Sequence, residues 1–131
     1  MFTRRDFGRM AFLPVSAMLA KKIDSVVNGV QFGLQSYIFS DIGLPHDGIL
    51  DLVIKSMVEC GLAECDLYAP LVEPGHLWER IRADVGEQAR EELAKWRKTV
   101  PLGHFRSIRN KFDGAGIAIH ALRANARITA Q

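Results

Sequence analysis

The sequence predicts an α/β fold built on parallel strands, and two observations support this class. Segments with the alternation and the aromatic or β-branched content of strands occur at 30–39, 63–69 and 117–122. Segments with apolar residues at helical spacing lie between them. Because strands joined through a helix pair in parallel with a right-handed crossover, this order predicts a parallel sheet of three strands.

The first connection carries the clearest helix of the chain. We expect it to begin at Asp47 as N-cap and to end at Gly61 as a left-handed C-cap. The spacing of apolar residues within 71–100 predicts a charge-rich helix with one narrow apolar stripe. We expect Gly86 to break this helix in two. A further helix is expected after Pro101, leading into the third strand.

Residues 1–20 have the pattern of a twin-arginine export signal. The pair Arg4-Arg5 precedes an apolar run at 10–20. That run has 11 residues, whereas a membrane-spanning helix needs about 20 apolar residues. We therefore expect a periplasmic or extracellular protein with no stable membrane anchor, and we interpret residues 21–29 as a linker.

Composition narrows the class of protein further. The net charge of +2 comes from residues 1–20, which hold three arginines and one aspartate, so the rest of the chain is neutral. A neutral chain lacks the basic excess that nucleic-acid binding requires, so we expect no nucleic-acid partner. Cys60 and Cys65 lie at a helix end and in the next strand, a poor arrangement for a disulfide, so we expect two buried thiols.

The C-terminal residues 123–131 show neither helical nor strand periodicity and are expected to form an irregular tail. A closed (βα)8 barrel needs eight strand–helix units and about 250 residues. The chain contains fewer than half of these units. A sheet of three parallel strands would have two open edges, which predicts possible self-association through them.

Three segments resemble the opening of the sugar phosphate isomerase/epimerase family, the xylose isomerase-like TIM barrels. They are Gly33–Phe39, Glu64–Pro70 and Val100–Ile117. The resemblance implies that residues 30–122 are the N-terminal part of a partial (βα)8 TIM barrel, with about three βα units.

The same resemblance implies an activity and a cofactor. Members of the family isomerise or epimerise sugars or sugar phosphates by proton transfer next to a carbonyl, assisted by a divalent metal. Their metal ligands lie on later strands than those of this chain, so we expect no metal site here. We also expect this piece to be inactive by itself, with a small-molecule sugar as the substrate of the intact barrel.

Barrel active sites lie at the C-terminal ends of the strands, and the predicted strand ends supply five candidates. His120 and Asp66 are the expected catalytic residues, for proton transfer and substrate contacts. Gln35, Tyr37 and Tyr68 are expected to bind the sugar. Structural roles stay open at this point: packing for the tyrosines, a structural acceptor for Asp66, and simple burial for His120.

Other functions are also open. A non-catalytic carbohydrate-binding or interaction protein would fit the same partial barrel. A barrel endonuclease is disfavoured by the neutral charge of the chain after residue 20. The sequence contains no Gly-x-Ser-x-Gly elbow, which disfavours an acyl-transfer hydrolase, and its histidines form no local metal motif such as His-Glu-x-x-His.

Overall fold

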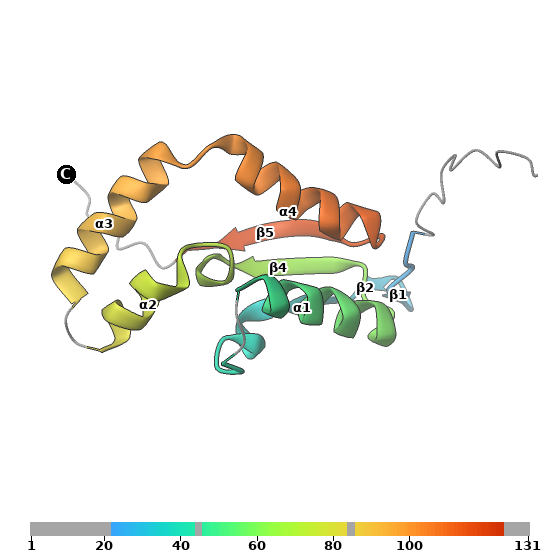
Figure 1. The fold of residues 1–131 in the computed structure, drawn as a ribbon. Helices are drawn as coiled ribbons and strands as arrows, with labels where there is room; N and C mark the ends of the chain where they lie inside the picture. Colours follow the sequence, from blue (N-terminus) through green and yellow to red (C-terminus); the bar gives the residue numbers. More distant parts are fainter. Residues whose placement is uncertain (1–21, 44–45, 84–85, 125–131) are drawn as a thin grey trace, which may run out of the picture.

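The centre of the fold is a sheet of three parallel strands in the order β3-β4-β5 (Figure 1). The structure, a computed structural model, describes residues 22–43, 46–83 and 86–124. The strands are β3 (Gly33–Gln35), β4 (Glu64–Tyr68) and β5 (Ala118–Arg123). The predicted α/β class and the parallel pairing are therefore confirmed. The predicted export signal at 1–20 lies outside the described residues.

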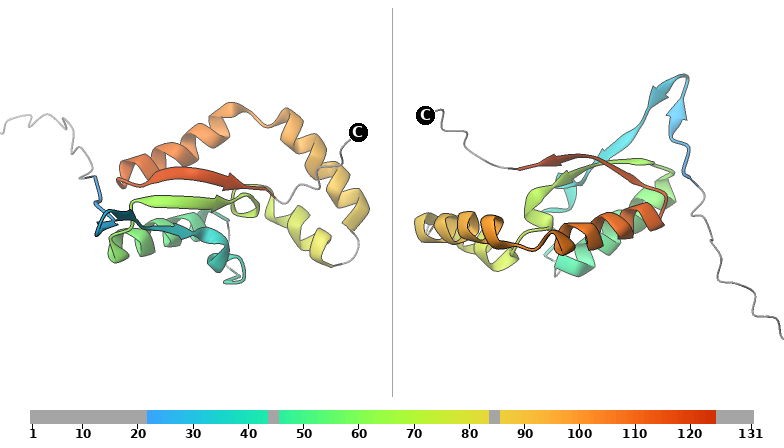
Figure 2. Two further views of the ribbon diagram at one scale, coloured as in Figure 1. Left: turned by 180° about the vertical axis from the view of Figure 1, so that it is seen from behind. Right: turned by 90° about the horizontal axis from the view of Figure 1, so that it is seen from above.

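Two helices cover one face of this sheet. Helix α1 (His46–Cys60) connects β3 to β4, and α4 (Leu102–Gly114) leads into β5. The view from above shows both helices on the same side of the strands (Figure 2). Parallel sheets are usually covered on both faces. In the described part of the chain the other face carries no helix, and we call it the open face.

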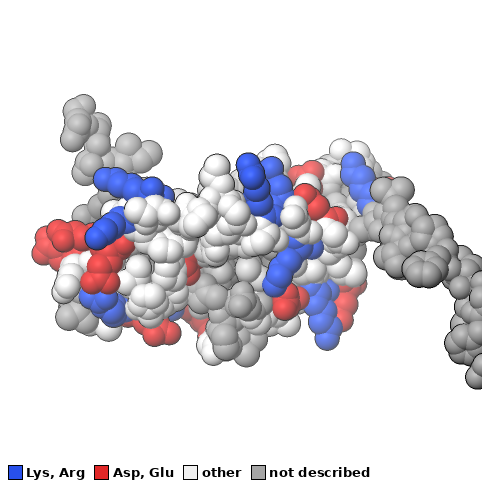
Figure 3. Space-filling model, turned by 45° about the horizontal axis from the view of Figure 1, so that its top comes forward, with Lys and Arg blue, Asp and Glu red and all other residues white. Residues whose placement is uncertain are grey.

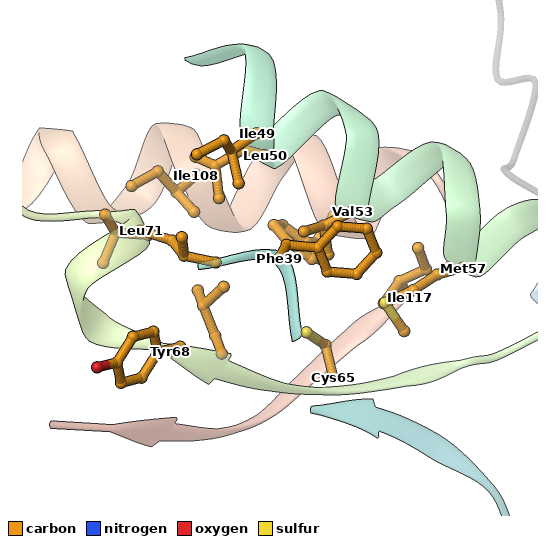
Figure 4. Close-up of a cluster of buried hydrophobic side chains, with 13 residues drawn as sticks. Phe39, Ile49, Leu50, Val53, Met57, Cys65, Tyr68, Leu71, Ile108 and Ile117 are labelled. Atoms are coloured by element: carbon orange, nitrogen blue, oxygen red, sulfur yellow. The ribbon is translucent and has the colours of Figure 1, made fainter. Parts of the chain in front are cut away.

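The hydrophobic core lies between the sheet and these two helices (Figure 4). Val53 and Met57 of α1, Cys65 of β4 and Phe112 of α4 are all fully buried. Burying each large apolar side chain contributes roughly 1.5–3 kcal/mol. Because side chains alternate along a strand, a core-facing Cys65 directs its neighbour Asp66 toward the open face.

Helices α2 (Gly75–Arg82) and α3 (Gly86–Thr99) form a separate unit, which we call the helical arm. They follow the short 3-10 turn η3 (Ala69–Leu71). The arm has its own small cluster of buried residues, namely Leu77, Trp78 and Leu93. The expected break of this segment near Gly86 is confirmed, since α3 begins there.

The predicted first strand at 30–39 is wrong in its extent. Its last four residues form the 3-10 turn η2 (Ser36–Phe39), and only β3 pairs with the parallel sheet. The hydroxyl of Ser36 is fully buried and accepts a hydrogen bond from the backbone N–H of Tyr68 at 2.8 Å. This contact favours the turn at the end of β3 because it satisfies the buried hydroxyl and the amide together.

The start of the same segment belongs to a hairpin. β1 (Val26–Val27) and β2 (Val30–Gln31) pair in antiparallel fashion. Asn28 and Gly29 form the turn with φ values of 52° and 80°, as a two-residue hairpin turn with both central residues at positive φ requires. The segment 21–29, interpreted from the sequence as a linker, thus contains the first strand of this hairpin.

The two predicted ends of the first helix differ in outcome. Asp47 lies inside α1 and not before it, because the helix begins at His46. Gly61 has a φ of 68°, and the backbone N–H of Leu62 donates to the carbonyl of Met57 at 2.9 Å. This is the expected left-handed C-cap, which closes the helix and turns the chain toward β4.

Candidate functional site

A polar cluster on the open face joins all three parallel strands. Gln35 and Asp66 are direct register partners on β3 and β4. Arg123 at the end of β5 places its Nη2 3.3 Å from Oδ2 of Asp66. With its amide oxygen toward the guanidinium, Gln35 accepts from Nη1 and Nε of Arg123 at 2.8 and 3.0 Å. This orientation is favoured because the opposite one sets the amide nitrogen against three guanidinium donors.

Asp66 has one carboxylate oxygen that this cluster leaves unused. Its Oδ1 is buried and receives no hydrogen bond from the described residues. A buried acceptor without a donor costs free energy, on the order of 1–3 kcal/mol. The oxygen is therefore suited to accept from a hydroxyl group that enters beside it.

His120 lies at a β-bulge in β5. Cys65 pairs with Ile119 and Asp66 pairs with Ala121, so His120 is the extra residue between them. Its Nδ1 lies 3.5 Å from Oε2 of Glu64, and its side chain is 74% exposed. Simple burial, the structural alternative for His120, is therefore wrong.

These side chains share one shallow pocket of about 480 Å³ on the open face. Gln35, Asp66, His120 and Glu64 line it, so three of the five predicted site residues meet there. Gly33 also contributes to the lining, and a Cβ at this position would lie 2.6 Å from the carbonyl oxygen of Glu64. The absence of a side chain at Gly33 thus allows β3 to approach β4 closely beneath the pocket.

The two predicted tyrosines lie outside the set of residues that line this pocket. Tyr37 and Tyr68 pack edge to face, with ring centroids 5.0 Å apart and an interplanar angle of 82°. Tyr68 is buried and belongs to the main core, whereas Tyr37 is half exposed. Their contact is a typical aromatic packing geometry.

Sequence reasoning missed two members of the cluster. Arg123 was assigned to the irregular tail, but β5 continues through it. Glu64 lies two residues before Asp66 in β4, so strand alternation alone places both on one face. That alternation was a usable signal for Glu64. No sequence signal indicated the bulge that brings His120 beside Glu64.

The charges of the open-face cluster bear on the metal that the family resemblance implies. Within the described residues, no group of three or more His, Cys, Asp or Glu side chains is placed to hold a metal ion. Asp66, the central carboxylate, faces the guanidinium of Arg123, which already supplies a positive charge. The described residues at this cluster therefore do not fit a divalent metal.

On the face in Figure 3, basic and acidic side chains are interspersed without a large patch of one sign. Comparisons with protein-family models, with curated proteins and with solved structures find no significant match. None of the helices within 22–43, 46–83 and 86–124 has the length and apolar character needed to cross a bilayer.

Proposed function

We propose that the open face is the sugar-facing wall of a partial (βα)8 barrel, and that its polar cluster serves an isomerase or epimerase acting on a sugar or sugar phosphate. The observation that carries the proposal is the convergence of Gln35, Asp66 and Arg123 from three adjacent parallel strands. In (βα)8 barrels the strand face opposite the helices forms the barrel interior, and the active site lies at the carboxyl ends of the strands, where Gln35 and Arg123 end β3 and β5.

Asp66 and Arg123 have the chemistry to bind the substrate. Oδ1 of Asp66 lacks a donor among the described residues but is buried, so the carboxylate has to turn toward the pocket to accept from a sugar hydroxyl, while Oδ2 is held by Arg123. The guanidinium of Arg123 offers donors suited to a carbonyl oxygen or a phosphate. Because Arg123 neutralises Asp66, this pair favours orientation of the substrate over proton abstraction.

His120 is the residue of the pocket suited to proton transfer. Its Nδ1 faces Glu64, so Nε2 is the nitrogen that would accept a proton from the carbon next to the carbonyl. The carbon–hydrogen bond breaks, its electron pair forms the carbon–carbon double bond, and the former carbonyl oxygen becomes the oxyanion of an enediolate. The imidazolium returns the proton to the same carbon, which regenerates the carbonyl, or to the neighbouring carbon after the hydroxyl proton has passed from the second oxygen to the first. Glu64 stabilises the imidazolium in between, and no oxidant or reductant is needed.

The proposal is tested by solvent proton exchange. The purified chain is incubated with D-xylose, D-glucose or their phosphates in heavy water, and deuterium at the carbon next to the carbonyl is followed by NMR. Complete isomerisation is not expected of this piece by itself. The first proton transfer needs only His120 and a bound sugar, so we expect exchange that is lost in His120→Gln. Asp66→Asn should raise the substrate concentration needed for half-maximal exchange, because a binding contact is weakened.

Glu59→Gln is the matched control, since Glu59 is an exposed carboxylate on α1 whose ion-pair partner is Lys55. It should exchange like the unchanged protein. Equal exchange in His120→Gln and the unchanged protein would contradict the assignment of His120.

The alternative is a carbohydrate-binding protein without catalysis. The engagement of Asp66 by Arg123 favours it, because both groups then serve recognition. Saturable binding of a sugar that Asp66→Asn weakens, without any exchange, would select this alternative.

A further inference from the structure

A second pocket, larger than the one on the open face, lies away from that face. It has a volume of about 830 Å³ and runs between the helical arm on one side and α1 and α4 on the other. Leu50 of α1 and Ile108 of α4 contribute to it from the main core, and Trp96 contributes from the arm. It thus separates the two hydrophobic clusters of the fold. Junctions between packed units are common places for ligand sites, and we call this pocket the arm groove.

We propose that the arm groove binds the ring of a neutral sugar. The inference rests on the lining of the groove and is independent of the proposed catalytic role of the open face. The two sites lie on opposite sides of the sheet, because the arm groove is built on the helices that cover the other face.

The apolar part of the groove includes an aromatic surface. Trp96 is half buried and contacts His104 edge to face, with ring centroids 5.6 Å apart. Leu71 and Val72 continue the apolar lining. The C–H face of a pyranose ring packs on such a surface, since an indole combines a large apolar area with a polar N–H.

Polar groups line the groove from two helices. His104, Ser107 and Lys111 follow one another at steps of three and four along α4, so they share one side of that helix. His76 and Glu79, three residues apart, line the groove from α2. Nε2 of His104 already contacts the carbonyl of Val72 at 2.7 Å, and the hydroxyl of Ser107 donates to the carbonyl of His104 at 2.7 Å. The Ser107 oxygen can still accept from a sugar hydroxyl, and His76 and Glu79 add polar atoms from α2 beside the apolar lining.

The charges at the groove favour a neutral ligand. Glu73 is held by Arg97, with Nε to Oε1 at 2.7 Å. Lys111 is paired with Asp51, with Nζ to Oδ1 at 3.3 Å. A phosphate would have to compete with Asp51 for Lys111. It would also approach the carboxylates of Glu73 and Glu79, which line the groove. A neutral polyol avoids both costs.

The two tryptophans allow a direct test on the unaltered chain. Trp96 lines the groove, whereas the buried Trp78 donates its indole N–H to Glu73 at 3.0 Å. In ¹H–¹⁵N NMR spectra, assigned with Trp96→Phe, D-glucose and D-xylose should shift the Trp96 indole signal saturably and that of Trp78 less, because Trp78 is outside the lining and touches the groove only through Glu73. A weak site has a Kd of about 1 mM, so titration to about 100 mM covers it.

Two substitutions in α4 test whether the sugar binds in the groove or elsewhere on the helix. Ser107→Tyr fills the groove and should reduce the affinity at least tenfold. Asn110→Tyr places the same side chain on an exposed position of α4 outside the groove and should leave the titration unchanged. Circular dichroism and the Trp78 signal report whether each variant is folded.

The outcomes distinguish this site from the open face. Asp66→Asn should leave the Trp96 shift intact, whatever its effect on exchange or on other sugar binding. The inference is overturned if Trp96 shows no saturable shift, if Ser107→Tyr binds as well as the unchanged chain, or if Asp66→Asn abolishes the shift. Tighter binding of glucose 6-phosphate than of glucose would overturn the neutral-ligand assignment.

Discussion

Arg97 of α3 donates two hydrogen bonds to Glu73, from Nε to Oε1 at 2.7 Å and from Nη2 to Oε2 at 3.0 Å. The Glu73 side chain is only 7% exposed and also accepts from the indole N–H of Trp78. Glu73 lies between the sheet and the arm, so one carboxylate fixes both helices of the arm to the end of the β4–η3 segment. This contact sets the shape of the arm groove.

Removing the arginine should therefore destabilise the fold. Arg97→Met leaves a buried carboxylate without its counter-ion, and we expect a loss on the order of 2–3 kcal/mol in the free energy of unfolding. Urea denaturation measures it. Arg80→Met is the control, because Arg80 and Glu92 form a similarly short pair whose carboxylate is far more exposed, 41% for Glu92 against 7% for Glu73. Comparable losses in both variants would contradict the role given to burial.

Gly33 should tolerate no side chain. In Gly33→Ala the new Cβ would lie 2.6 Å from the carbonyl oxygen of Glu64, so β3 has to move away from β4. We expect a loss of about 1–3 kcal/mol in the free energy of unfolding, as in other overpacked sites. Gly103→Ala is the matched control on α4, where a Cβ meets nothing within 4 Å. It should be neutral or stabilising by roughly 0.5–1 kcal/mol. Equal stability of the two variants would refute the proposed clash.

Gly61 should be replaceable by asparagine more readily than by alanine. Its φ of 68° lies in the left-handed region, and the space around its Cβ position is open. Gly61→Ala is expected to cost about 1 kcal/mol from backbone strain alone. Gly61→Asn should cost less, because asparagine adopts this conformation more easily. Thermal unfolding of the two variants checks the order, and a more stable alanine variant would exclude strain as the cause.

Cys65 makes a pH-dependent contribution to the free energy of unfolding. Burial, with a smaller contribution from Asp66, raises the pKa of its thiol from 9.0 to about 12. The unfolded chain ionises first, so this contribution is complete below about pH 9 and is lost as the pH rises toward 12. From about pH 8 to pH 10.5 the loss should be about 2 kcal/mol.

Two measurements test this contribution of Cys65. Cys65→Ala should remove the extra fall in the free energy of unfolding between these pH values, whatever its own stability. In Cys60→Ser, a thiol reagent should label Cys65 only as fast as the protein opens. Cys60 is exposed, so the expected burial of both thiols is wrong for this residue, and Cys60 should react freely in Cys65→Ala. Rapid labelling of Cys65 in the folded chain at neutral pH would show that the thiol is accessible.

Several parts of the fold are predictable because their causes are local. The apolar stripe of α1 and the glycine at position 61 define a helix and its end from neighbouring residues alone. Asn28-Gly29 is an equally local hairpin signal, and it was missed because the alternation after Val30 favoured one long strand. Ser36 ends that strand through a contact with Tyr68, 32 residues away, which local patterns do not reveal.

The candidate site also has a part that local patterns predict and a part that they do not. The strand pattern predicts that Gln35 and Asp66 lie on parallel strands whose carboxyl ends meet at one edge of the sheet. The tertiary structure decided that Arg123 reaches Asp66 and that His120 faces Glu64. Both contacts depend on the register between β4 and β5 and on the bulge within it. The amino-acid sequence determined the strands, the helices and their parallel order, because periodicity and turn residues act over a few positions. Only the packed sheet decided which side chains meet, since register is set by contacts between segments more than 50 residues apart.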